Sequence, residues 1–112
     1  MDIGMMAVLL IGGHALADYP LQGDFLSRGK NRTAPILGMA WQQLLFAHAS
    51  IHGAVVALVT GIWWLAIAET AIHFVTDDAK CRGRITFNQD QAIHFACKAL
   101  WLLVAVHWEV EP

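Results

Sequence analysis

The sequence predicts an all-α fold: a four-helix transmembrane bundle, antiparallel in up-down order, with short loops. Hydrophobic residues make up 57% of the 112 residues and charged residues only 14%, whereas soluble domains have about 45–50% and about 25%. The apolar residues form four runs near the length of about 17–25 residues that crosses a bilayer as a helix. All basic residues except Lys98 lie in two short segments between these runs. We therefore expect a single integral-membrane domain over residues 1–112.

The four predicted helices cover about residues 3–19, 35–59, 62–80 and 88–108. The first is apolar from Ile3 to Ala17 except for His14, and no Lys or Arg precedes it. A cleaved signal peptide usually begins with basic residues, so we expect this helix to remain uncleaved.

Capping and breaking residues set the boundaries of the other three helices. Thr33 and Pro35 predict the start of the second helix, with Thr33 as the N-cap and Pro35 in the first turn. Only Thr60-Gly61 separates the second run from the third, which predicts a tight antiparallel hairpin. Asn88 is expected to cap the fourth helix after a basic turn.

The distribution of charge predicts the orientation in the membrane. With four spans, both basic loops lie on one side of the bilayer: Arg28, Lys30 and Arg32 in one, Lys80, Arg82 and Arg84 in the other. The acidic residues Asp2, Glu109 and Glu111 lie on the opposite side. The positive-inside rule then predicts a multi-pass protein of the bacterial inner (cytoplasmic) membrane, with cytoplasmic basic loops and both termini outside. The lipid bilayer is the expected partner, the net charge of −2 indicates no nucleic-acid binding, and the oligomeric state stays open.

Each predicted helix carries ionisable residues four positions apart, which places them on one face. The four stripes are His14 and Asp18; His48 and His52; Glu69, His73 and Asp77; and Asp90, His94 and Lys98. Counting depth at about 1.5 Å per residue predicts three layers. The central layer holds His14, His48, His73 and His94, and the cytoplasmic layer holds Asp18, Asp77 and Asp90. The outer layer holds His52, Glu69 and Lys98.

Imidazole and carboxylate together suit a divalent metal such as Zn, Mn or Fe. Helix bundles build such sites from side chains projecting inward. The predicted ligands are His14, Asp18, His48, His52, His73, Asp77, Asp90 and His94, enough for one or two ions. The aspartates could instead orient the imidazoles. A buried histidine is ordinarily hydrogen-bonded to a neighbour, but a charge in the bilayer costs about 2.5–3.5 kcal/mol, which favours a functional role for so many polar groups.

Glu69 and Lys98 are the candidate catalytic residues. The simplest interpretation is a buried ion pair that joins the third and fourth helices; the alternative is that Glu69 acts as a general base or an extra ligand. Asp78 faces away from the stripe and is expected to be solvated. The loop around Lys30 would meet anionic lipid, either generally or by holding a headgroup near the site. Cys81 and Cys97 lack metal-site spacing and are expected to be reduced and structural.

These residues resemble a family of small bacterial and phage inner-membrane proteins of unknown function (DUF3307-like). The resemblance rests on His14-Ala-Leu-Ala-Asp18-Tyr-Pro-Leu-Gln22 with Asp24, on His48, on His73-Phe-Val-Thr-Asp77 and on Asp90-Gln91-Ala-Ile-His94. It covers nearly the whole chain and implies a multi-span membrane protein with no established activity. Asp18-Tyr-Pro replaces an expected Asp-Phe-Leu, so Pro20 is expected to end the first helix early. A more distant likeness, in residue types alone, is to inner-membrane metal-dependent hydrolases.

The leading functional prediction is a metal-dependent hydrolase that acts on a lipid-like or phosphoester substrate near the cytoplasmic leaflet. A second is a non-enzymatic phage or bacterial membrane protein that is envelope-modifying, holin-like or partner-binding. A third is a small ion or proton conductor that uses the histidine and aspartate layers as a relay.

Overall fold

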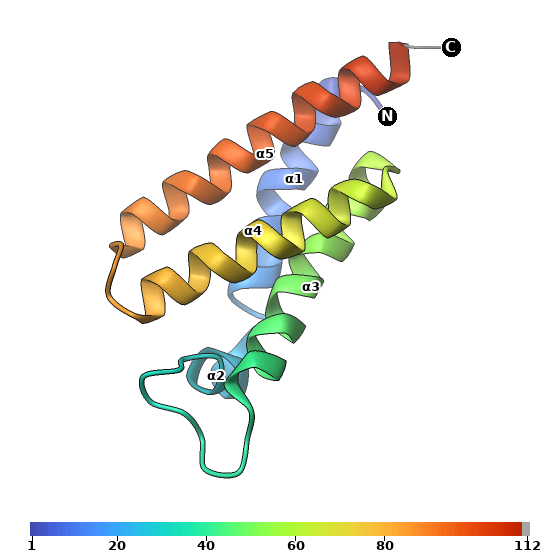
Figure 1. Ribbon diagram of the computed structural model, residues 1–112. Helices are drawn as coiled ribbons and strands as arrows, with labels where there is room; N and C mark the ends of the chain where they lie inside the picture. The colour runs from blue at the N-terminus through green and yellow to red at the C-terminus, as the bar shows by residue number, and fades with distance from the viewer. Residues whose placement is uncertain (111–112) are drawn as a thin grey trace.

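The computed structural model describes residues 1–110, which form five α-helices and no strand (Figure 1). The helices are α1 (Ile3–Asp18), α2 (Gly23–Gly29), α3 (Trp41–Thr60), α4 (Trp63–Cys81) and α5 (Phe87–Val110). The all-α class is therefore confirmed, and the four long helices correspond to the four predicted ones. Of the predicted acidic tail, Glu111 lies outside the described residues.

The segment between α1 and α3 differs from the prediction. It contains the short helix α2, and α3 begins at Trp41 rather than near residue 35. Thr33 does not cap α3, because its backbone N–H donates to Asn31 Oδ1 at 2.9 Å in a local turn. Gly38 has a φ of 81°, a left-handed conformation that interrupts a helix. Residues 31–40 consequently form an irregular loop at one end of the molecule (Figure 1).

The start of α5 is also capped by a different residue. Thr86 Oγ1 accepts from the Gln89 backbone N–H at 3.1 Å, and Gln89 Oε1 accepts from the Thr86 backbone N–H at 2.9 Å. This reciprocal pair is a capping box, a Ser or Thr followed three residues later by Glu or Gln. The prediction that Asn88 caps the helix was wrong because the Thr86–Gln89 pair satisfies two backbone donors at once.

The four long helices alternate in direction, and both chain ends lie at the same end of the bundle (Figure 1). Helix α1 contacts α3 and α5, helix α4 contacts the same two, and α1 and α4 lie across from each other. The α3–α4 contact is the most extensive, and Gly61 ends α3 with a φ of 72°, as a tight hairpin requires. At Gly53 a Cβ atom would lie 2.6 Å from the Ala66 carbonyl oxygen, so glycine allows this close approach.

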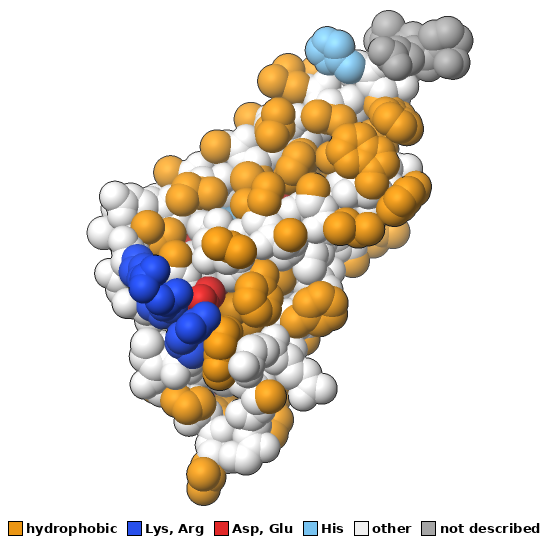
Figure 2. Space-filling model, viewed as in Figure 1, with side chains coloured by type: hydrophobic (Ala, Val, Ile, Leu, Met, Phe, Trp, Pro, Cys, Tyr) orange, Lys and Arg blue, Asp and Glu red, His pale blue; other side chains and the backbone are white. Residues whose placement is uncertain are grey.

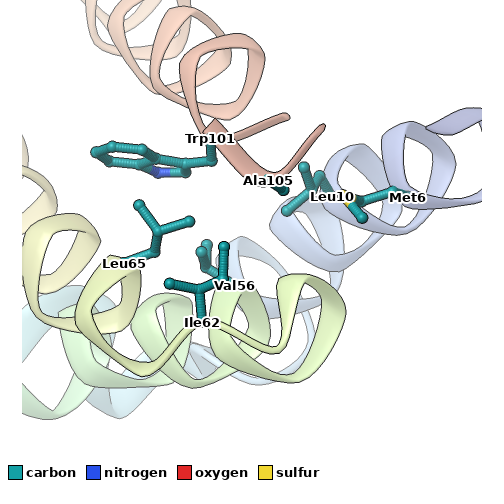
Figure 3. Close-up of a cluster of buried hydrophobic side chains, with 7 residues drawn as sticks. All are labelled: Met6, Leu10, Val56, Ile62, Leu65, Trp101 and Ala105. Atoms are coloured by element: carbon teal, nitrogen blue, oxygen red, sulfur yellow. The ribbon is translucent and has the colours of Figure 1, made fainter. Parts of the chain in front are cut away.

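The interior is divided into an apolar half and a polar half. A cluster of hydrophobic side chains fills the end near the termini: Met6, Leu10, Val56, Ile62, Leu65, Trp101 and Ala105 (Figure 3). The half near α2 and the α4–α5 turn is filled by buried polar and charged side chains, among them all five histidines of the predicted stripes. A soluble core rarely buries so many ionisable groups.

The surface is correspondingly apolar. Large hydrophobic side chains are exposed on every long helix, including Leu58 at 83%, Trp63 at 72% and Val75 at 69%, and Figure 2 shows them over most of the visible face. Only α3 is long and apolar enough to cross a membrane by itself among the described residues; α1 and α2 qualify together as a pair bent by 78°. Helix α1 has 16 residues, and the inward-facing polar residues lower the hydropathy of α4 and α5. Four membrane spans therefore stay a prediction.

Candidate metal centre

Five histidine rings from four helices meet in the polar half of the bundle. The rings of His52 and His73 stack with centroids 3.8 Å apart, and those of His73 and His94 stack at 4.0 Å. His14 lies 5.0 Å from His52, and His48 lies 5.1 Å from His73. All five are at most 2% exposed. The predicted convergence of the stripes on one interior is thus present.

His52 lies in this central cluster and not in the outer layer predicted for it. Side chains on a helix lean toward its N-terminus. Helix α3 begins at the end that carries the basic loops, so the His52 ring leans down into the layer of His73. The opposite lean, on α1, carries the Asp18 carboxylate up toward the same rings.

Four of the predicted ligands place one atom each within 4.8 Å of all the others: Asp18, His48, His52 and His73. His52 Nε2 lies 2.8 Å from Asp18 Oδ1, and His48 Nε2 lies 3.4 Å from the same oxygen. His73 Nε2 lies 3.3 Å from His48 Nε2 and 4.0 Å from Asp18 Oδ1. Metal–ligand bonds of about 2.0–2.1 Å in a tetrahedral site separate the ligand atoms by about 3.3–3.4 Å. The quartet is therefore close to the size of a tetrahedral metal site.

The close approach of two imidazole nitrogens also fits a cation. His48 and His73 direct Nε2 at each other, while their Nδ1 atoms have no hydrogen-bond partner among the described residues. If each ring carries its proton on Nδ1, both Nε2 lone pairs face one point, which is the arrangement of metal ligands. Asp18 adds a negative charge beside that point.

The second oxygen of Asp18 faces the remaining polar residues. His14 Nε2 lies 3.1 Å from Asp18 Oδ2, and the Gln91 side-chain amide donates to that oxygen at 3.2 Å. Gln91 also donates to Asp90 Oδ2 at 3.2 Å, and His94 Nε2 lies 3.2 Å from Asp90 Oδ1. His14, Asp90 and His94 therefore border the quartet through hydrogen bonds and stay predicted ligands.

Asp77 lies at the inner border of the quartet, with Oδ2 3.4 Å from His48 Nε2. The same oxygen is 2.7 Å from Lys30 Nζ, and Oδ1 is 3.0 Å from Lys80 Nζ. Two lysines therefore compensate the charge of Asp77. The geometry favours a carboxylate that borders the site over one that is free to bind an ion.

A model of the family described as "Protein of unknown function (DUF3307)" matches residues 5–110. The chain belongs to the DUF3307 family. The resemblance inferred from the His and Asp motifs is thereby confirmed, while the membrane and phage associations stay predictions. No curated protein and no solved structure matches the chain.

In this DUF3307 chain, Glu69 and Lys98 form the buried ion pair that the spacing predicts, with Lys98 Nζ donating to Glu69 Oε1. Trp101 Nε1 donates to Glu69 Oε2 at 2.9 Å. Glu69 Oε1 also lies 3.6 Å from Nδ1 of His73. A carboxylate on the far nitrogen of a ligand imidazole orients the ring and raises its basicity. The contact suits a positioning role for Glu69; a catalytic role for either residue stays a prediction.

The sequence did not indicate that the two loop cations of the DUF3307 chain reach its interior. Lys30 is 3% exposed and donates to the side chain of Gln22 as well as to Asp77. Arg32 binds Asp78 through two hydrogen bonds of 2.9 and 2.7 Å. Asp78 is 6% exposed, so the prediction that it is solvated was wrong. Two adjacent carboxylates at the end of an apolar helix were the available signal, because each needs a cation if it is covered.

Proposed function

We propose that this protein is a membrane-embedded metal-binding protein, in which Asp18, His48, His52 and His73 hold a divalent cation. The observation that carries the proposal is the spacing of the quartet: four buried ligand atoms, from α1, α3 and α4, at the separations of a tetrahedral site. Zn²⁺ favours this geometry and these ligands, whereas Mn²⁺ and Fe²⁺ would recruit further oxygen ligands nearby.

The membrane location is supported by the distribution of polarity. Apolar side chains cover the outside of all four long helices, and ionisable ones fill half of the interior. Helix α3 has 20 residues, about 30 Å at 1.5 Å per residue, which matches the hydrocarbon core. Contacts of Lys30 and Arg32 with the end of α4 bring both basic loops together. We propose four spans, with the α1–α2 pair as a broken one and the basic loops in the cytoplasm.

Hydrolysis is the reaction that such a site would serve. A divalent cation there would supply Lewis-acid activation of a water molecule. The chain's own residues exclude bulk water, orient His73 through Glu69, and place the Asp77 carboxylate beside the ligand set. The substrate we propose is a phosphoester or other ester of a lipid-like molecule, which would approach from the cytoplasmic side.

Metal content tests the metal site directly. Protein purified in detergent should contain about one Zn, Mn or Fe per chain by elemental analysis, and His73→Gln or Asp18→Asn should lose most of it. His107→Ala is the matched control, because His107 is exposed at the far end of α5 and contacts only its own helix. A well-folded wild type without metal, or equal losses in His107→Ala and His73→Gln, would rule out the site.

Hydrolysis needs a separate measurement. Metal-loaded wild type and His107→Ala should cleave a chromogenic phosphodiester, and His73→Gln should not. Circular dichroism of each variant shows whether the fold is retained. Full metal occupancy without turnover would remove the hydrolase proposal and leave the metal site intact.

A further inference from the structure

A groove of about 670 Å³ runs between α3 and α4 on the outside of the bundle. Phe46 and Phe74 border it near the basic loops, and Ala54 and Ile67 border it toward the α3–α4 turn. Its lining is almost entirely apolar. The hydroxyls of Ser50 and Thr70, which also line it, each donate to a carbonyl of their own helix. The groove therefore offers apolar contact and no free hydroxyl donor.

The end of the groove near Phe74 leads to a group of cations. The rings of Phe74 and Trp41 have centroids 6.3 Å apart, and the Arg32 guanidinium carbon lies 4.2 Å above the Trp41 ring. Arg32 and Arg82 share Asp78 and are 38% and 29% exposed. Figure 2 shows these basic side chains gathered around a red carboxylate, with hydrophobic surface directly beside them.

The cations outnumber the carboxylates at this end. Lys30, Arg32, Lys80 and Arg82 surround only Asp77 and Asp78. Two of the cations, Arg32 and Arg82, keep guanidinium surface accessible after pairing. Arginine is the side chain best suited to bind a phosphate group. The surface thus combines an apolar groove with a phosphate-binding end.

We propose that this surface binds one anionic phospholipid, with its acyl chain in the α3–α4 groove and its phosphate at Arg32 and Arg82. The inference rests on the membrane location proposed above. Charge complementarity and the two-part character of the surface select the ligand, and the groove volume is in the range of about 300–1,000 Å³ usual for ligand sites. A helix of a second copy is less suited, because Ser50 and Thr70 have no hydrogen bond left to offer it.

Native mass spectrometry of the detergent-purified protein with added palmitoyl-oleoyl phosphatidylglycerol or phosphatidylcholine tests the site. Wild type should bind one phosphatidylglycerol about tenfold more tightly than phosphatidylcholine, the factor expected for one charge-assisted hydrogen bond. Arg32→Gln should abolish that preference, and Arg32→Lys should retain part of it. Ala71→Phe, which fills the groove, should weaken the binding of both lipids.

The matched controls are Arg28→Gln and Ala96→Phe. Arg28 is exposed and pairs with Asp24, and Ala96 is exposed on α5 away from the groove. Both variants should bind as the wild type does. Equal loss in Arg28→Gln and Arg32→Gln would overturn the site in favour of diffuse attraction. A dimer that Ala71→Phe dissociates would overturn it in favour of a second copy.

Metal content measured on the same samples keeps this proposal separate from the metal site. Arg32→Gln and Ala71→Phe should retain the metal of the wild type, since neither residue contacts the quartet. Selective phosphatidylglycerol binding in a protein without metal would uphold the lipid site and end the metal proposal. Metal with no lipid preference would do the reverse.

Discussion

Single buried charges in this protein are held by specific partners that lie far away in the sequence. Lys30 reaches Asp77 from the loop before α3, and Lys98 reaches Glu69 from the neighbouring helix. All four side chains are at most 4% exposed. Removing one partner of such a pair leaves an uncompensated buried charge, which costs more than the pair contributes.

Lys30→Met should therefore destabilise the protein by about 3 kcal/mol, the lower end of the range for broken buried pairs, because Lys80 still faces Asp77. Denaturant unfolding in detergent measures this change. The double variant Lys30→Met/Asp77→Asn should recover most of the loss. Arg28→Met, at an exposed pair, serves as the control and should leave stability unchanged. A loss in the double variant equal to that of the single one would show that packing of the lysine stem, not its charge, matters.

Glu69→Gln tests whether this carboxylate orients His73. The amide can still accept from Trp101, but it no longer places a charge 3.6 Å from His73 Nδ1. Metal affinity should fall by about 10–100-fold, the usual effect of removing such a partner. Competition with a chelator measures the affinity. Adding Lys98→Met should restore stability without restoring affinity; recovery of both would mean that Glu69 acts only through the fold.

At the level of residues, the sequence predicted the centre better than its border. The four-residue spacing was enough to bring His48, His73 and Asp18 together, because helix geometry fixes which side chains share a face. The lean of His52 and the burial of Lys30 were not predictable in this way. Each depends on the direction of a helix or the path of a loop relative to its neighbours.

Among the elements, α3 and α4 form the closest pair, and Gly53 is the point of closest approach. Gly53→Ala should place a Cβ atom against the Ala66 carbonyl oxygen and separate the helices. A loss of about 1–3 kcal/mol is expected for such overpacking. Thermal unfolding in detergent measures it, with Gly12→Ala as the control, since a Cβ there meets nothing within 4 Å. Equal stability of the two variants would mean that the hairpin tolerates a wider spacing.

The long helices were predictable because each has a sustained apolar run, and the hairpin because Thr60-Gly61 is its only interruption. Helix α2 was not, since seven residues between Gly23 and Gly29 carry no periodic apolar pattern. The start of α3 was misplaced for a related reason: Pro35 suits a first helical turn, but nearby Gly38 takes a positive φ.

For the whole molecule, exposed apolar surface and buried charge together predict integration into a bilayer. Expressed in bacteria, the protein should stay in the membrane fraction after alkaline carbonate extraction. In a Cys81→Ser/Cys97→Ser background, cysteines placed at Ser27 and Arg84 should be labelled only from the cytoplasmic side, and one at Asp2 only from outside. Recovery in the soluble fraction would instead indicate that this apolar surface is covered by other protein chains.

The hydrophobic cluster near the termini closes one end of the bundle above the buried polar centre. Trp101 points toward Leu65 across this end (Figure 3), and its indole N–H is already bonded to Glu69. A hydrated ion would find no oxygen ligand on that route, so exchange with the histidines would proceed past Lys30 and Asp77 alone. Occupancy would then follow the ion supply of a single compartment and be insensitive to the medium at the opposite face.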